Sequence, residues 1–285
     1  MKLPSRVTSW LHENGHGDIS SVEPAAGGCI NNGARLLTST GATFFLKQND
    51  TTPDDMFKRE VEGLNALDVE GAPRVPTPLL AGDTFLLMED LDPGPRSDQY
   101  WPDFGRQLAT LHGQIGPKFG FEHDNYIGST PQQNPWTEDG HEFFGQHRLL
   151  FQARLAQENG LLGTTELSQT ENLARRLPDL VPEQPPSLLH GDLWSGNAIA
   201  DSEGSPALID PAAYYGWAEA ELAMTTLFGR FPGAFYKAYE EVRSLDRGWQ
   251  ERLPLYNLYH LLNHLNLFGR SYLSQVQSIL RRYSD

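Results

Sequence analysis

The chain has 285 residues, enough to bury a sizeable core in one domain or in two closely packed lobes. Its 22 basic residues are outnumbered by 37 acidic ones, and the resulting formal net charge of −15 argues against nucleic acid or an anionic membrane as the main partner. No signal-peptide pattern and no run of about 18 apolar residues are present. The single cysteine, Cys29, excludes an intrachain disulfide, so we expect a cytoplasmic protein.

Residues 1–91 are expected to form a small β-rich lobe. Strands are predicted at 19–25, 34–40 and 43–48, because these alternating segments are separated by the turn-forming stretches AGGCINNG and TG. An amphipathic helix is predicted to begin at Pro53 and to end at Gly71. The segment 77–91 then predicts a hairpin that leads out of this lobe.

Residues 92–285 are expected to form a larger, mainly α-helical lobe. Helices are predicted at 98–115, 142–160 and 165–177, and several more follow Glu219. An irregular segment is expected at 120–136, and a short hairpin at 197–210. The sequence therefore predicts an α+β protein with two lobes.

The loop HGDLWSGN at 190–197 carries the residues that point to a reaction. An aspartate, an asparagine five positions later and a second aspartate after a hairpin are the arrangement used in kinase-type phosphoryl transfer. In that arrangement Asp192 accepts the proton of the substrate hydroxyl, while Asn197 and Asp210 supply the oxygen ligands that Mg²⁺ prefers. The alternative is that these side chains only stabilise local turns. The agreement of three residue types favours a kinase that uses ATP and Mg²⁺.

The small lobe offers a partner pair for the phosphates. Lys47 ends an apolar strand, and Glu60 lies in the centre of the apolar stripe of the following helix. Because a carboxylate on a packing face is unfavourable unless it is paired, we expect a Lys47–Glu60 ion pair. The alternative is that Glu60 lies at the edge of the stripe and reaches water.

The rest of the nucleotide site is predicted from position in the chain. Gly27 and Gly28 lie between the first two strands, where glycines allow close approach to phosphate oxygens, although the same segment is compatible with a plain hairpin turn. Glu89 and Leu91, at the end of the second hairpin, are expected to contact the nucleotide as well. Cys29 is either a reactive thiol, able to form only intermolecular disulfides, or an inert small side chain.

The acceptor side is less sharply defined. Trp194 either packs on the apolar face of a sugar or belongs to the core. The helix at 253–269 has an aromatic and polar side that either lines a substrate cleft or is a packing surface with internally satisfied polar groups; it comprises Tyr256, Tyr259, His260, Asn263 and His264. A zinc site at His260 and His264 is not expected, since the sequence contains no HExxH motif.

Several segments resemble the fructosamine kinase, or ketosamine-3-kinase, family, and the resemblance covers essentially the whole chain. They are GGCINN, FFLKQN, MFKREVEGLNAL, HGDLWSGN, IDPAAYYGWAEAELAM, LFGRFPGAFYKAY and LYHLLNHLNLFG. The resemblance implies a bilobal, protein-kinase-like fold and ATP-dependent phosphorylation of the 3-hydroxyl of ribulosamines or fructosamines on amines or proteins. The phosphorylated product decomposes and releases the amine, so the implied role is deglycation repair.

The resemblance also assigns residues. It implies that Asp192 is the catalytic base, that Asn197 and Asp210 bind Mg²⁺, and that Lys47 and Glu60 position the phosphates. Substrate contacts are expected from residues of the matching segments and of the predicted cleft, namely Trp194, Tyr215 and His264.

Two positions depart from the family pattern. Trp217 stands where a histidine is usual, and Gly140 lies where a tryptophan is common, four residues after Trp136. These departures leave open how the amine-bearing part of the substrate is held. The remaining alternatives are a kinase of aminoglycosides or choline, and a nucleotide-binding regulator without catalysis, against which the intact base, lysine and metal ligands argue. We expect a monomer or a weak homodimer.

Overall fold

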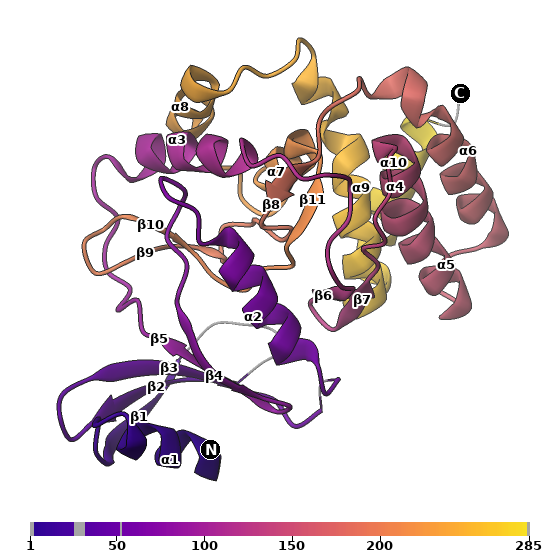
Figure 1. The fold of residues 1–285 in the computed structure, drawn as a ribbon. Coiled ribbons are helices and arrows are strands. Elements are labelled where there is room, and N and C mark those ends of the chain that lie inside the picture. Colours follow the sequence, from indigo (N-terminus) through magenta and orange to yellow (C-terminus); the bar gives the residue numbers. More distant parts are fainter. Residues whose placement is uncertain (1–2, 26–31, 52, 284–285) are drawn as a thin grey trace.

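The computed structural model describes residues 3–25, 32–51 and 53–283, and Figure 1 shows them as two lobes. The small lobe contains an antiparallel five-stranded sheet in the order β1-β2-β3-β5-β4, and the predicted α+β, bilobal arrangement is observed. Its strands are β1 (Ile19–Ala25), β2 (Asn32–Thr38), β3 (Thr43–Gln48), β4 (Pro78–Gly82) and β5 (Phe85–Glu89). The predicted strands and the second hairpin are therefore confirmed, with β2 displaced because residues 39–42 form its turn.

Both faces of this sheet are covered by helices. Helix α1 (Ser5–Glu13), which was not predicted, packs Val7 and Leu11 onto one face. Helix α2 (Met56–Leu67) lies on the other face, between the sheet and the large lobe (Figure 1). Because side chains alternate along a strand, Leu46 of β3 faces α1 whereas Lys47 faces α2.

Helix α2 is shorter than predicted at both ends. It begins at Met56, whose backbone N–H donates to Pro53, and it ends at Leu67. Gly71 adopts the left-handed conformation in a turn beyond the helix rather than at its end. The side chain of Asp55 does not cap the helix, because its carboxylate binds Arg59 and Tyr126 instead.

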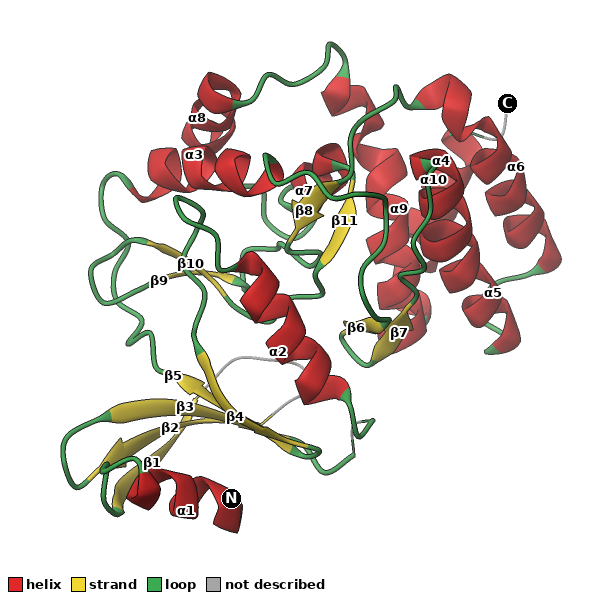
Figure 2. Ribbon diagram, viewed as in Figure 1, coloured by secondary structure: helices red, strands yellow, loops and turns green. Residues whose placement is uncertain are grey.

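The large lobe is mainly helical, as Figure 2 shows, and its described residues also form three short antiparallel pairs of strands. The pairs are β6 (Asn125–Ile127) with β7 (Thr130–Gln132), β8 (Ser187–Leu189) with β11 (Tyr214–Gly216), and β9 (Ala198–Ala200) with β10 (Pro206–Leu208). The helices are α3 (Tyr100–His112), α4 (Gly140–Phe143), α5 (Phe151–Glu158), α6 (Thr164–Leu180), α7 (Ala218–Met224), α8 (Gly233–Val242), α9 (Trp249–Phe268) and α10 (Leu273–Arg282). Among the described residues, no helix combines the length and the apolar character that crossing a membrane requires.

Two segments of the large lobe differ from the prediction. The expected irregular segment at 120–136 contains the β6–β7 hairpin, and the single helix expected at 142–160 is interrupted by a π-helix at Phe144–Leu150. This π-helix buries Arg148 completely, with its guanidinium 4.0 Å from the ring centre of Tyr214. The spacing of apolar residues cannot reveal such a change, because it reflects the average number of residues per helical turn and not one wider turn.

Candidate active site

The loop that follows β8 is held from below by a buried carboxylate. Glu221 of α7 accepts hydrogen bonds from the backbone N–H groups of His190, at 3.0 Å, and Gly191, at 2.6 Å. Gly191 has φ +87°, and a Cβ atom there would lie 2.0 Å from the carbonyl oxygen of Ala212. Only glycine fits this close approach, so the turn at Gly191 fixes the backbone position of Asp192.

Asp192 lies partly exposed at the start of this turn and contacts Asn197. The Asn197 side-chain amide donates to the Asp192 carbonyl oxygen at 2.9 Å and to its carboxylate at 3.2 Å. Burial, together with the nearby Asp210 carboxylate, raises the pKa of Asp192 to about 7. A carboxylate with this pKa changes its protonation state near neutral pH.

Lys47 of β3 joins the two lobes. Its ammonium group binds the carboxylates of both Glu60 and Asp210. The predicted Lys47–Glu60 ion pair is thus confirmed, and the alternative that Glu60 reaches water is wrong. Burial by itself lowers the pKa of Lys47, but the carboxylates of Asp210 and Glu60 more than offset this and raise it above its ordinary value.

Asp210 adopts an unusual backbone conformation at this point. Its φ of +58° is rare for a residue other than glycine, and such strain persists only where the surrounding contacts impose it. Its side chain remains about one-third exposed, at 36%, while it binds Lys47. Asp210 is therefore held by Lys47 of the small lobe, close enough to Asp192 for the two carboxylates to influence each other.

The other predicted nucleotide residues lie at the exit from the sheet. The Glu89 carboxylate binds Arg74 and accepts from Thr77 N at 3.2 Å, so this side chain is already engaged within the protein. Leu91 is buried, and its carbonyl oxygen accepts from Ser202 N at 3.2 Å. Its backbone N–H takes part in no hydrogen bond within the described part of the chain. The predicted Gly27 and Gly28, and with them Cys29, lie outside the described residues.

The structure places the three predicted substrate residues in two regions. Trp194 is partly exposed and covers Gly196, where a Cβ atom would lie 2.3 Å from its ring. Its neighbour Ser195 donates to the carbonyl oxygen of Phe228 at 3.1 Å, and the Phe228 ring centre lies 4.5 Å from that of His264. The residue next to Trp194 is therefore connected to His264 through Phe228.

Tyr215 lies elsewhere. It belongs to β11, and its ring packs against Phe121 and Trp136, with centre-to-centre distances of 6.3 and 6.1 Å. Within the described ranges, no hydrogen bond or ring contact joins it to Trp194 or His264.

Comparison with known proteins places the chain in a family. The family model for fructosamine kinase matches residues 4–285. The chain belongs to the fructosamine kinase family. It is 42% identical to a Synechocystis protein named a probable ketoamine kinase, over 93% of this chain and 90% of that one, and 40% identical to the chloroplastic protein-ribulosamine 3-kinase of Arabidopsis thaliana, over 97% and 87%.

Solved structures agree with this membership. A Thermobifida fusca protein described as a candidate fructosamine-3-kinase superposes with a TM-score of 0.86 at 33% identity, covering 98% of both chains. An aminoglycoside phosphotransferase with bound ADP shares the fold at 13% identity, with a TM-score of 0.64. The family and the bilobal, protein-kinase-like fold predicted from the sequence are confirmed.

The two departures from the fructosamine kinase pattern meet in space. A Cβ atom at Gly140 would lie 2.6 Å from the indole nitrogen of Trp217 and 2.6 Å from the ring of Phe119. Trp217 is almost completely buried, with 3% of its surface exposed. The Trp217 ring therefore fills the space that a side chain at position 140 would need.

The polar side of α9 is mainly a packing surface. The Tyr256 hydroxyl donates to Glu219 at 2.9 Å, and the Tyr259 hydroxyl donates to Gln132 at 2.6 Å. Of the two interpretations of this face, internal satisfaction of its polar groups holds for both tyrosines, whereas the half-buried His264 packs against Phe228.

Sequence reasoning missed Glu221. No motif marks it, because WAEAELAM contains two acidic residues in a short helix and nothing in their spacing tells which one is buried beneath the catalytic loop. Its role is visible only once β8 and α7 are adjacent.

Proposed function

We propose that this chain transfers the γ-phosphoryl group of ATP to the 3-hydroxyl of a ketosamine, a sugar joined to an amine. The observation that carries the proposal is the contact of Lys47 with both Glu60 and Asp210, beside the Asp192–Asn197 pair. The names of its relatives, ketoamine kinase and protein-ribulosamine 3-kinase, support this class of acceptor.

Asp192 is the proposed catalytic base. A carboxylate with a pKa of about 7 is about half ionised at pH 7 and increasingly ionised above it, so its ionised form can accept the proton of the attacking hydroxyl. Glu221 acts on this step indirectly, because it fixes the backbone that precedes Asp192. Lys47 is proposed to bind the phosphates of ATP, and Glu60 to hold the ammonium group in place.

Asn197 and Asp210 are the proposed Mg²⁺ ligands, and their donor atoms fit this ion. The amide nitrogen of Asn197 is engaged by Asp192, whereas its carbonyl oxygen accepts no hydrogen bond from any described residue. Asp210 adds a partly exposed carboxylate, and Mg²⁺ prefers such oxygen ligands. When bound, the ion would neutralise part of the negative charge on the phosphate oxygens.

The nucleotide base is proposed to lie against the segment from Glu89 to Leu91. The Leu91 N–H, unused by the described part of the protein, suits a ring nitrogen of the base. Gly27 and Gly28 are proposed to contact the phosphates. The division into lobes at residues 91 and 92 is proposed on the same basis, since the nucleotide then binds between 1–91 and 92–285.

Trp194 and His264 are proposed to bind the sugar, because aromatic rings suit the apolar face of a polyhydroxylated chain and Trp194 lies two residues beyond Asp192. Tyr215 is proposed for the same substrate, at the more distant position that its packing gives it. We expect the smaller ribulosamine to be preferred to fructosamine. The monomer or weak homodimer and the cytoplasmic location stay predictions.

A panel of acceptors with coupled detection of ADP tests the proposal. Ribulosamine and fructosamine on lysine are expected to give ADP, while free lysine, choline and kanamycin are not, and Asp192→Asn serves as the control for background ATP hydrolysis. A far higher kcat/KM for choline or kanamycin than for either ketosamine would show that the acceptor is not a ketosamine. Nucleotide binding without turnover of any acceptor would favour the regulator instead.

A further inference from the structure

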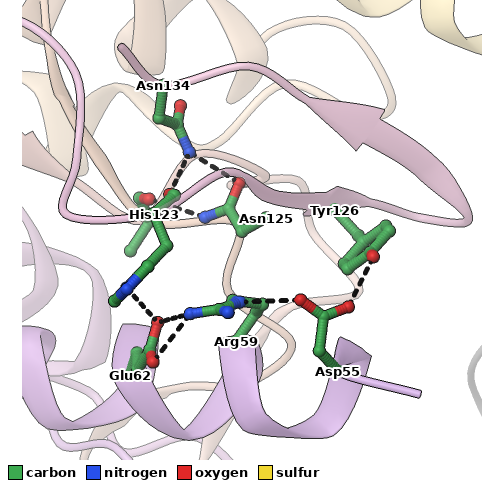
Figure 3. Close-up of polar contacts among 8 residues, drawn as sticks. Asp55, Arg59, Glu62, His123, Asn125, Tyr126 and Asn134 are labelled. Carbon is green, nitrogen blue, oxygen red and sulfur yellow. Dashed lines mark hydrogen bonds and ion pairs between the residues drawn. The ribbon is translucent and has the colours of Figure 1, made fainter. Parts of the chain in front are cut away.

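The β6–β7 hairpin and its flanking residues contact two of the three segments that meet at Lys47. Those segments are β3, which carries Lys47, helix α2, which carries Glu60, and the loop after β10, which carries Asp210. Figure 3 shows the first of the two sets of contacts, between α2 and residues 123–134.

On the side of α2, the hairpin is tied to the helix by two polar contacts. The Tyr126 hydroxyl donates to Asp55 at 2.6 Å, and the His123 ring nitrogen lies 3.1 Å from the Glu62 carboxylate (Figure 3). Arg59 connects the two acceptors, at 3.0 Å from Asp55 and 2.8 Å from Glu62. The hydrogen bond from Tyr126 lowers the pKa of Asp55, so the bond is made to a carboxylate and is stronger than one between neutral groups.

On the other side, buried amides of the hairpin hold the backbone that follows Asp210. The Asn125 amide donates to the carbonyl oxygen of Ala213 at 2.8 Å, and the Gln132 amide donates to that of Ala212 at 3.0 Å. Gln132 also donates to Asn125 at 2.7 Å. Both amides are at least 95% buried, so neither can exchange these partners for water.

Helix α2 and the Asp210 segment also touch each other directly. A Cβ atom at Gly63 would lie 3.4 Å from both Pro211 and Ala213, which leaves little room between the helix and the segment. The contacts therefore form a closed circuit: the helix touches the segment, and the hairpin holds both. A shift of the hairpin would move Glu60 relative to Asp210.

We propose that Asn125 and Tyr126 are positioning residues for phosphoryl transfer, because β6 fixes helix α2 against the Asp210 segment in the arrangement that lets Lys47 bind Glu60 and Asp210 together. This inference goes beyond the proposed function and rests on it for the reaction. Neither residue touches Lys47. They act through the two carboxylates that hold its ammonium group.

The test removes only the Tyr126 hydroxyl. Tyr126→Phe is expected to lower kcat/KM for ATP about tenfold, the effect of about 1.4 kcal/mol of lost positioning, while KM for the ketosamine changes less than about twofold. Tyr283→Phe is the matched control, because its hydroxyl donates to the backbone carbonyl oxygen of Glu251 at 3.2 Å and not to the hairpin, and its kinetics are expected to stay at the wild-type level. Wild-type kinetics in a folded Tyr126→Phe variant would overturn the proposal.

A second variant and a readout without the acceptor complete the test. Asp55→Ala removes the partner of Tyr126 and also its contact with Arg59. The double variant is expected to lose no more activity than Asp55→Ala alone, since that change already removes the Tyr126–Asp55 contact. Multiplying losses would overturn the proposal. Hydrogen exchange of residues 56–67, with a non-hydrolysable ATP analogue bound, is expected to be faster in both variants and unchanged in Tyr283→Phe. Unchanged exchange would also overturn it, and this readout stands even if no ketosamine is phosphorylated.

Discussion

The phosphoryl-transfer residues and the acceptor residues are held together in different ways. Lys47 touches Glu60 and Asp210 directly, whereas Trp194 is connected to His264 indirectly, through its neighbour Ser195 and through Phe228. A buried charge requires an opposite partner, so few arrangements are compatible with such a set. An aromatic ring can pack against many kinds of side chain, so its sequence position alone does not determine which residues it contacts.

The strongest way to test this difference is to remove, one at a time, the carboxylate of the proposed base and the carboxylate of Asp210. Asp192→Asn is expected to lower kcat about 10³-fold and to leave nucleotide affinity nearly unchanged, because the carboxylate acts on the hydroxyl and not on ATP. Asp210→Ala is expected to weaken binding of Mg²⁺-ATP as well, since it removes a proposed metal ligand and a partner of Lys47. Steady-state kinetics and titration with a fluorescent ATP analogue separate the two effects. Near-wild-type turnover in both variants would refute the proposed roles.

The carboxylate beneath the loop gives the next largest effect. Glu221→Gln is expected to lower the free energy of unfolding by about 2 kcal/mol, because hydrogen bonds to an ionised group are replaced by weaker ones. It is also expected to lower kcat, since His190 and Gly191 lose their anchor. Glu219→Gln on the same helix is the control, because Glu219 binds Arg252 and not the loop, so kcat should not change.

The Glu221→Gln variant is also expected to change how the stability of the protein depends on pH. Burial raises the pKa of Glu221, but the hydrogen bond from His112 and the other donors outweigh it and leave the pKa below the ordinary 4.5. The stability that the carboxylate contributes is therefore full above pH 4.5 and is lost as the pH falls toward the lower folded value. Urea unfolding from pH 3 to pH 7 is expected to show a smaller pH dependence in Glu221→Gln than in the wild type. Parallel curves would contradict this assignment.

The part of the site that the sequence predicts well is the part built on spacing and charge. The distance from Asp192 to Asn197 along the chain, and the position of Glu60 in an apolar stripe, each restrict the local geometry before any fold is known. The contacts of Glu221, Asn125 and Tyr126 depend instead on which segments lie side by side. The π-helix around Arg148 and the short β6 and β7 strands were missed for a related reason, because tertiary contacts override weak local preferences there.

Gly140 and Trp217, the two positions that differ from the family pattern, allow a test of whether this region contacts the ketosamine. Gly140→Ala is expected to destabilise the protein by about 2 kcal/mol, since the added methyl group would overlap the rings of Trp217 and Phe119. In a Trp217→His background the loss should be smaller, because the imidazole ring leaves space. Thermal unfolding of the four proteins measures this coupling. KM for the ketosamine is expected to stay within about twofold in all of them, as for a core site; a larger change would place the pair in the acceptor pocket.

The smallest expected effect separates the two proposed aromatic contacts. Trp194→Ala is expected to raise KM for the ketosamine about tenfold and KM for ATP less than about twofold, because the ring lies two residues beyond Asp192 on the acceptor side. Tyr215→Ala is expected to raise KM for the ketosamine only about twofold, since its ring already packs against Phe121 and Trp136. Equal increases in KM for the two variants would show that both residues contact the acceptor. The bound ketosamine would then have to extend from the loop that contains Trp194 to strand β11, which contains Tyr215.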